Sequence, residues 1–148
     1  MKAPKKRINS KNKGSTYERE IVNMFKDLGY VKAKTSRATS KLLDDCKIDI
    51  NFIPYLVQTK CGYPTVRPKY EVLKKECIEL INKHFPEDEA QKLLEKPYVL
   101  FHKLKGKNEI VSIDRNLFMD FVVCKDFKEF CEAQFPEILK SYHDSRIL

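Results

Sequence analysis

The sequence predicts an α/β protein of the α+β sandwich type, in which helices flank a small central mixed β-sheet. Its 148 residues are the length of one ordinary domain. Segments with helical and strand periodicity follow one another in the order α, β, β, β, α, α, β, β, α, and none of them repeats. We therefore expect a basic flexible arm over residues 1–13 and a single domain over residues 14–148.

The first helix is predicted over residues 15–28. Ser15 and Glu18 have the spacing of a capping box, which favours a helix that begins at Ser15. Gly29 follows as a C-terminal cap. Apolar side chains recur between these ends at helical spacing, at Tyr17, Ile21, Met24, Phe25 and Leu28.

Three strands are predicted next. Residues 30–35 alternate weakly between apolar and polar side chains, whereas residues 47–52 alternate clearly. The apolar face of the second segment consists of Ile48, Ile50 and Phe52. The polar residues 36–46 predict a loop, and residues 55–60 are a third run of strand character after a turn at Pro54. We expect the second and third strands to form a β-hairpin.

The second half of the chain continues with helices and strands. Glycine and proline residues predict a loop over residues 61–68. The elements expected after it are helices over 70–85 and 86–96, strands over 98–102 and 109–113 around a turn at 106–108, and helical residues 115–142 with breaks near Asp126 and at Pro136.

The composition is that of a globular protein whose positive charge is concentrated near the N-terminus. No apolar run approaches the roughly 18 residues that span a bilayer, and the basic start lacks the apolar stretch of a secretory signal. Residues 1–40 carry eleven Lys/Arg and three Asp/Glu, whereas the remaining residues carry eighteen of each. This local excess favours a polyanionic partner, DNA or RNA, and a cytoplasmic or nucleoid location.

The cysteines do not indicate a metal site. They form no CxxC pair, and their odd number argues against a complete disulfide framework. We expect reduced thiols in a reducing compartment, at Cys46, Cys61, Cys77, Cys124 and Cys131.

Asp49, Gln58 and Lys60 are polar residues within two apolar strands. Side chains two apart on a strand share a face, and the expected hairpin brings Asp49 beside Gln58 and Lys60. Carboxylate and amide oxygens are ligands that Mg²⁺ accepts, and a lysine can orient water or stabilise developing negative charge. With Glu18 as a second carboxylate, the set favours phosphodiester cleavage by a metal-activated water.

Short motifs precede these residues in a fixed order: Lys13-Gly14, Glu18-Arg19-Glu20, Gly29-Tyr30 and Ser36-Arg37-Ala38-Thr39-Ser40. Together with Asp49 and the later Gln58-Thr59-Lys60, they resemble the PD-(D/E)xK nuclease superfamily. The closest resemblance within it is to the archaeal and phage Holliday junction resolvases. The resemblance covers residues 13–60 and extends loosely to the segment 98–113.

The resemblance implies a restriction-endonuclease-like core and a homodimeric endonuclease that cuts branched DNA, such as four-way junctions, and leaves a 5′-phosphate. The implied cofactor is Mg²⁺, for which Mn²⁺ can substitute. Asp49, Gln58 and Glu18 would hold the metal, and Lys60 would be the catalytic lysine. The DNA contacts expected with this site are Arg37, Ser40, Ser36, Arg19, Lys13 and Lys41.

Two departures from the pattern leave alternatives open. Gln58 stands where the superfamily has an acid, so a nucleic-acid-binding protein of the same fold without activity is one alternative. Asp44 or Asp45, in the long segment before Asp49, is an alternative metal ligand. A related nuclease for repair, restriction or phage DNA processing would use the same residues.

A purely structural interpretation of the same residues also exists. Glu18 would then only close a capping box. Asp49 and Lys60 would form a cross-strand salt bridge on a solvated face of the hairpin.

Overall fold

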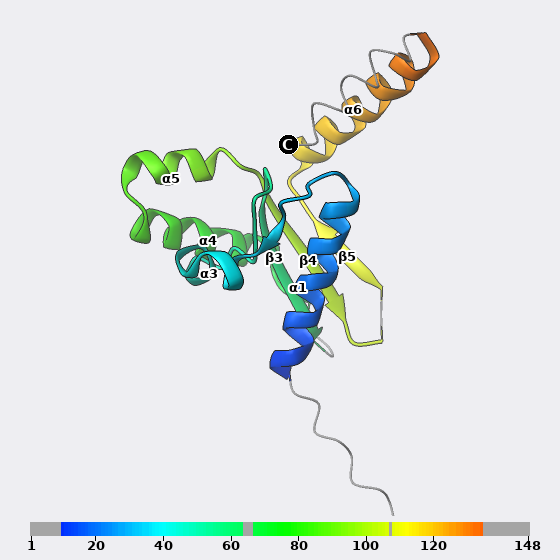
Figure 1. Ribbon diagram of the computed structural model, residues 1–148. Helices are drawn as coiled ribbons and strands as arrows, with labels where there is room; N and C mark the ends of the chain where they lie inside the picture. The colour runs from blue at the N-terminus through cyan, green and yellow to red at the C-terminus, as the bar shows by residue number, and fades with distance from the viewer. Residues whose placement is uncertain (1–9, 64–66, 107, 135–148) are drawn as a thin grey trace, which may run out of the picture.

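The computed structural model describes residues 10–63, 67–106 and 108–134, and it has a small mixed β-sheet at its centre (Figure 1). Strands β3 (Leu56–Tyr63), β4 (Tyr98–Leu104) and β5 (Glu109–Ser112) lie in that order. β3 and β4 are parallel, whereas β4 and β5 are antiparallel. β1 (Lys34–Thr35) and β2 (Ile50–Asn51) form a separate antiparallel pair. The prediction of a mixed α/β fold with a small mixed sheet is confirmed.

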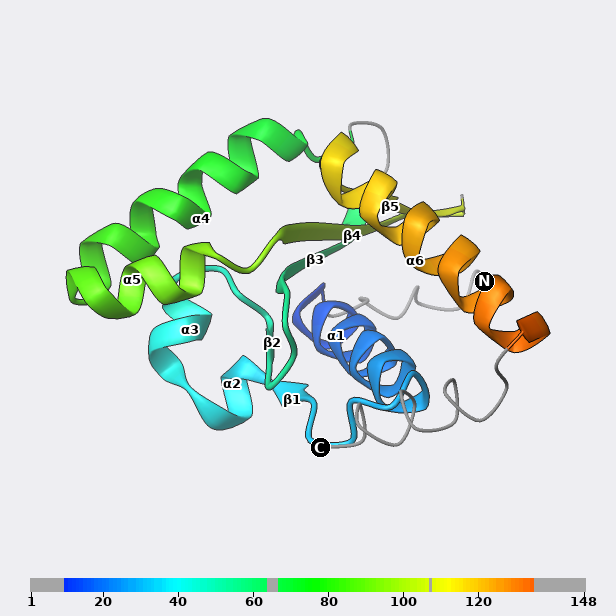
Figure 2. The ribbon, with the colours of Figure 1, turned by 90° about the horizontal axis from the view of Figure 1, so that it is seen from above.

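Helices lie on both faces of the three-stranded sheet (Figure 2). α1 covers one face, and α4 lies on the opposite side together with α5. α6 follows β5 and projects away from the sheet (Figure 1). The helices in the described residues are α1 (Ser10–Asp27), α2 (Ser36–Thr39), α3 (Lys41–Asp45), α4 (Tyr70–His84), α5 (Glu87–Leu94) and α6 (Arg115–Gln134). None of them has an apolar stretch long enough to cross a membrane.

Two apolar clusters hold these layers together, and alternation along β3 supplies both of them. Val57 points into the cluster beneath α1, which includes Tyr17 and Ile21. Its neighbour Leu56 points into the cluster beneath α4 and α5, which includes Cys77 and Ile81. Successive strand residues point to opposite faces, so each residue of β3 is assigned to one of the two sides by its position.

The first helix begins earlier than its sequence pattern indicates. α1 starts at Ser10, so Ser15 lies inside the helix and the predicted capping box is wrong. Ser15 Oγ instead accepts a hydrogen bond from Arg37 at 3.0 Å. Residues 10–13 of the expected flexible arm are therefore helical, and residues 1–9 lie outside the described part of the chain. The sequence pattern missed this turn because it consists of polar and basic residues with no apolar period.

Two short helices replace the loop predicted for residues 36–46. α2 and α3 fill this segment, and the strand predicted over 30–35 is reduced to the two residues of β1. α3 ends in a Schellman motif, in which the Ile48 amide donates to the Leu43 carbonyl and the Lys47 amide donates to the Asp44 carbonyl. Lys47 adopts the required left-handed conformation, with φ 66°.

The predicted hairpin between residues 47–52 and 55–60 is wrong. β2 is only two residues long and pairs with β1, while β3 pairs with β4 in parallel. Phe52 has φ 64°, which ends the extended conformation after Asn51. Its side chain is therefore 54% exposed and does not share a buried face with Ile48 and Ile50 as expected.

The second half of the chain agrees more closely with its sequence pattern. α4, α5, β4 and β5 lie within two residues of their predicted bounds. β3 continues to Tyr63 and so includes residues expected in a loop, with a bulge at Gly62, whose φ is 91°. α6 is continuous near Asp126, where a break was predicted. The predicted break at Pro136 lies outside the described residues.

Candidate active site

The backbone of Asp49 fastens the segment before β2 to the open edge of β3. β3 is an edge strand, so its outward amides and carbonyls need partners from elsewhere. The Asp49 amide donates to the Val57 carbonyl at 2.8 Å. The Asp49 carbonyl accepts from the Ser36 amide, also at 2.8 Å. Asp49 therefore lies where the edge of β3 meets the start of α2.

The Asp49 carboxylate also contacts this edge. Its Oδ2 accepts a hydrogen bond from the Thr59 amide at 2.6 Å and from Thr59 Oγ1 at 3.1 Å. Its Oδ1 has no hydrogen-bond partner among the described residues. One carboxylate oxygen is thus fixed by β3, while the other remains available to a ligand.

The charges of Glu18 and Lys60 both act on the carboxyl group of Asp49. The pKa of Asp49 is raised to about 7, mainly by burial, and the two Thr59 hydrogen bonds oppose this effect. The charge on Glu18 contributes to the raised pKa of Asp49, whereas Lys60 lowers it. Both charges are therefore close enough to act on the same carboxylate, although Glu18 and Lys60 come from α1 and β3.

Glu18 is a buried carboxylate in the middle of α1. Its side chain is 9% exposed, and its Oε1 accepts a hydrogen bond from Arg37 Nη2 at 3.1 Å. Burial raises the pKa of Glu18, Arg37 lowers it and Asp44 raises it. Like Asp49, Glu18 has a second oxygen, Oε2, without a partner among the described residues. The role of Glu18 as a helix cap is excluded because α1 begins two turns earlier.

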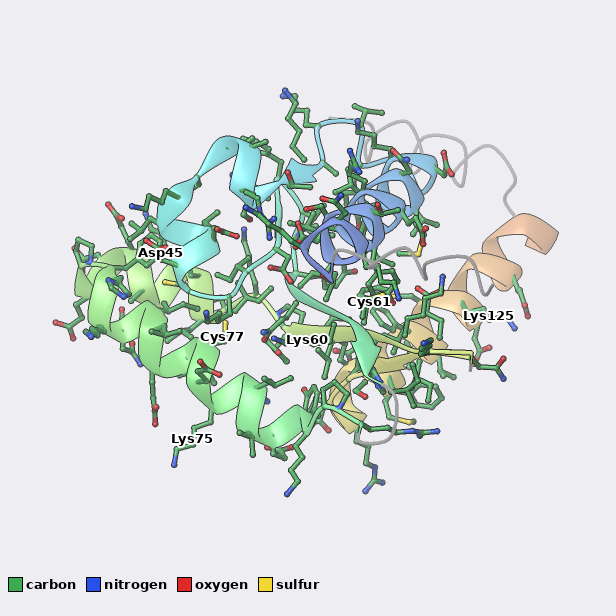
Figure 3. All side chains as sticks on the ribbon, turned by 90° about the horizontal axis from the view of Figure 1, so that it is seen from below. Asp45, Lys60, Cys61, Lys75, Cys77 and Lys125 are labelled. Atoms are coloured by element: carbon green, nitrogen blue, oxygen red, sulfur yellow. The ribbon has the colours of Figure 1, made fainter. Side chains whose placement is uncertain are left out.

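Gln58 and Lys60 share the face of β3 that points toward α4. Figure 3 shows Lys60 on the side of β3 where Cys77 of α4 lies. Lys60 makes neither a hydrogen bond nor an ion pair with another described residue, so the Asp49–Lys60 salt bridge of the purely structural interpretation is not formed. Gln58 is buried, and its Oε1 accepts a hydrogen bond from the Tyr98 hydroxyl at 2.6 Å. The Gln58 oxygen thus has one lone pair left for a metal.

These residues fit a magnesium ion that keeps much of its water shell. Within the described residues, no three His, Cys, Asp or Glu side chains form a ready metal cluster. Magnesium, however, is commonly held by one or two carboxylates together with water and substrate phosphate. Asp49 and Glu18 each offer a free carboxylate oxygen, and their mutual repulsion is the kind of strain that a bound cation relieves.

Asp44 lies closer to this site than Asp45. Its charge raises the pKa of Glu18, and its side chain is half-buried on α3. The side chain of Asp45 is exposed, and its charge acts on Cys46 instead. Of the two alternative metal ligands, the lower exposure of Asp44 and its charge effect on Glu18 favour Asp44.

The expected DNA contacts divide into exposed and structural residues. Arg37, Arg19 and Lys41 are exposed, and Lys13 is half-buried on α1. Ser40 caps α3, since its Oγ accepts from the Leu43 amide at 3.3 Å. Ser36 is fully buried, which leaves its side chain no surface for DNA in this conformation, and its Oγ has no partner among the described residues.

Three residues near the site carried no role in the sequence interpretation. Thr59 positions Asp49, and Tyr98 positions Gln58. His102 lies opposite Lys60 in the register of β3 and β4 and is 3% exposed. Burial lowers the pKa of His102, and Arg67 adds to this effect, so a neutral imidazole lies beside the lysine. The parallel pairing that brings Tyr98 to Gln58 and His102 to Lys60 joins residues about forty positions apart, and no local pattern could have indicated it.

No protein-family model, curated protein or solved structure matches this chain.

Proposed function

We propose that this protein is a metal-dependent DNA endonuclease of the PD-(D/E)xK type, selective for branched DNA and acting as a Holliday junction resolvase. The observation that carries the proposal is the convergence of Glu18, Asp49 and Lys60 at the open edge of β3. Two carboxylates that repel each other, one of them on the buried Glu18, are costly to hold together unless they serve a ligand.

The order of motifs along the chain supports the same proposal. Lys13-Gly14, the Glu18 helix, the Arg37 segment, Asp49 and Lys60 follow one another as in the resolvases they resemble. The contacts between these segments give the resemblance a spatial counterpart, because Arg37 contacts Glu18 at 3.1 Å and the charge of Glu18 acts on Asp49. We also propose that the fold of this protein is a restriction-endonuclease-like core.

In the proposed mechanism, Asp49 and Glu18 would hold a Mg²⁺ or Mn²⁺ ion through the carboxylate oxygens that have no partner among the described residues. When bound, such an ion lowers the pKa of a coordinated water and neutralises charge on the phosphate. The Thr59 amide and hydroxyl keep the Asp49 carboxylate in place through its other oxygen. Because Thr59 holds Oδ2, the orientation of the Asp49 carboxylate is fixed, and Oδ1 faces the ligand.

Lys60 supplies the positive charge for the reaction. Its ammonium is free of hydrogen bonds to the described residues, so it can donate to the attacking water or to a non-bridging phosphate oxygen. The neutral His102 beside it adds no competing charge. Arg37 is 47% exposed next to Glu18, and it can bind the phosphate that approaches the site.

The proposed substrate has two related strands to cut, and a twofold homodimer matches that symmetry. α6 projects from the sheet (Figure 1) and carries exposed apolar side chains, so it offers a surface for a second copy. These side chains are Phe118, Met119, Phe121 and Val123. A protein that stays monomeric at high concentration and on junction DNA would remove the basis for paired cutting.

A catalytically inactive DNA-binding protein of the same fold is the second candidate. One observation favours it: the Gln58 oxygen, at the position of the family's acid, is already bonded to the Tyr98 hydroxyl. Such a site has one negative charge less to hold a metal. Binding of branched DNA without cleavage would then be the whole activity.

A cleavage time course separates these candidates. Labelled four-way junction, flap, nicked duplex and linear duplex are incubated with the full-length protein in Mg²⁺, in Mn²⁺ or in EDTA. Metal-dependent cleavage with a preference for the junction supports the resolvase. A preference for linear duplex replaces it by a related nuclease, and tight junction binding without cleavage in either metal supports the binding-only protein.

A further inference from the structure

A basic cavity lies on the other flank of α1 from Glu18. Its volume is about 530 Å³. The first turns of α1, the end of β3 and the turn between β4 and β5 enclose it. We call this cavity the basic hollow, and its charged lining residues are Lys13, Glu20, Lys103 and Lys105.

The helical geometry of α1 sets the basic hollow and the candidate active site on two sides of one helix. Lys13, Tyr17 and Glu20 are three or four residues apart and form one stripe along the hollow. Ser15 and Glu18 form a different stripe, which contacts Arg37. The outer surface of α1 between these stripes is therefore the shortest connection between the two sites.

That outer surface is positively charged. Arg19 is exposed on it and donates a hydrogen bond to Thr16 Oγ1 at 3.4 Å, on the side of the hollow. Arg37 lies at one end of the connection, and Lys13 lies at the other. A charged chain that crosses α1 here passes Arg37, Arg19 and Lys13, and Glu20 is the acid beside them.

The cations of the hollow are available to an anion. Lys103 Nζ is 3.9 Å from Glu20 Oε2 and 6.0 Å from the centre of the Tyr17 ring. Both partners of this ion pair are about half exposed, and such pairs contribute little to stability, so a phosphate can displace Glu20. Lys13 and Lys105 form no ion pair within the described part of the chain.

The surroundings favour a polyanion over a single small anion. The first turn of α1 has no acidic residue, and the amides at a helix N-terminus add positive potential. The sequence before Ser10 carries four further Lys/Arg and no acid. Within the described residues, Lys13 and the pair Lys103 and Lys105 come from separate segments, as binding to a nucleic acid backbone requires.

We propose that the basic hollow binds the DNA phosphate backbone away from the cleaved bond, with Lys13, Lys103 and Lys105 as its contacts. This inference rests on the proposed function for the path of the DNA across α1. Because phosphate contacts position a duplex without reading its sequence, the hollow holds one arm of the substrate while the cleaved strand lies at Asp49.

Equilibrium binding over a salt series tests the inference with the full-length protein. Fluorescently labelled DNA duplex and four-way junction are titrated in EDTA, so that cleavage does not contribute. The double variant Lys103→Gln/Lys105→Gln removes two cations of the hollow. The control, Lys83→Gln/Lys92→Gln, removes the same charge from exposed positions on α4 and α5.

A plot of log affinity against log salt concentration has a negative slope, and each lost phosphate contact reduces its magnitude by about 0.9. The double variant should therefore have a slope that is shallower than that of the wild type by about 1.8. Its affinity at low salt should fall by roughly tenfold or more, while the control keeps the wild-type slope. Glu20→Gln should change affinity in the opposite direction and bind DNA more tightly, because it frees Lys103. A purely structural role for these residues predicts no such reversal of sign.

A double variant that binds like the control overturns the inference. The inference is also overturned if the protein needs Lys103 and Lys105 to bind an acidic peptide or an RNA duplex but not to bind DNA. Wild-type protein that cuts DNA while these lysines have no effect refutes the hollow alone. Lysine-dependent DNA binding without any cleavage refutes the nuclease alone, and a failure of the wild type to bind DNA refutes both.

Discussion

Thr59 holds the Asp49 carboxylate through two hydrogen bonds to the same oxygen, from its amide at 2.6 Å and from its hydroxyl at 3.1 Å. Thr59 is the central residue of the Gln58-Thr59-Lys60 motif. The motif therefore orients the aspartate through its middle residue and supplies the lysine through its last.

Thr59→Val removes the hydroxyl and keeps both the shape and the amide. The loss of a hydrogen bond to the charged form should raise the pKa of Asp49 above its present value of about 7. Unfolding in urea should show a loss of about 0.5–1.5 kcal/mol. Thr59→Ser is the control, since it retains the hydroxyl, and equal pKa values for the two variants would contradict this role of Thr59.

The metal-free protein should lose stability as the pH rises from about 4 to about 7. In this range the folded state holds a proton on Asp49 that the unfolded state has already released. The folded state thus binds more protons, and its free energy of unfolding falls with increasing pH. Urea unfolding in a chelator, compared between the wild type and Asp49→Asn, isolates this contribution. A difference between the two proteins that does not vary with pH would mean that Asp49 has an ordinary pKa.

Gln58→Glu places a third carboxylate near Asp49 and Glu18. Without metal, the variant should be less stable at neutral pH by about 1–3 kcal/mol, because a buried charge is added. Mg²⁺ or Mn²⁺ should raise its melting temperature more than that of the wild type. Gln91→Glu, on the exposed surface of α5, makes the same charge change as a control.

The cleavage rate of Gln58→Glu decides between the two candidate functions. Cleavage gained by an inactive wild type identifies a site disabled by the glutamine. Cleavage lost from an active wild type makes the bond between Gln58 and the Tyr98 hydroxyl a working part of the site. A thermal response to metal equal to that of the Gln91 control argues against Gln58 as a neighbour of the metal.

Lys47→Gly should stabilise the protein. Lys47 ends α3 with φ 66°, a conformation that costs a lysine energy and a glycine almost none. The expected gain over Lys47→Ala is about 0.5–1 kcal/mol in the free energy of unfolding. The alanine variant removes the exposed charge but keeps the strain, so equal stability of the two variants would contradict the account of this turn.

The sequence predicted the elements whose signal is local. α4, α5, β4 and β5 have clear apolar periods, and their bounds were predicted within two residues. The start of α1 was missed because its first turn is polar, and its extra length moved Ser15 and Glu18 from the helix cap to its interior. Asp49 was expected to meet Gln58 and Lys60 through a hairpin that does not exist, and Asp49 instead contacts β3 through Thr59.

The remainder depended on long-range pairing. The alternation of Ile48, Ile50 and Phe52 is equally compatible with a long strand and with a short strand that ends in a left-handed turn. The side chain of Asp49 bonds to β3 itself, which no alternation pattern can indicate. Tyr98 and His102 reach Gln58 and Lys60 only through the parallel pairing of β3 with β4.

Single-turnover cleavage by Asp49→Asn tests the central claim most directly. The best DNA substrate of the wild type is used with saturating protein and Mg²⁺, and Asp45→Asn serves as the control on the exposed face of α3. The account predicts that Asp49→Asn cuts at least about a hundredfold more slowly than the wild type while it still binds DNA, and that Asp45→Asn cuts normally. Equal cleavage rates for Asp49→Asn and the wild type would contradict the assignment of this site.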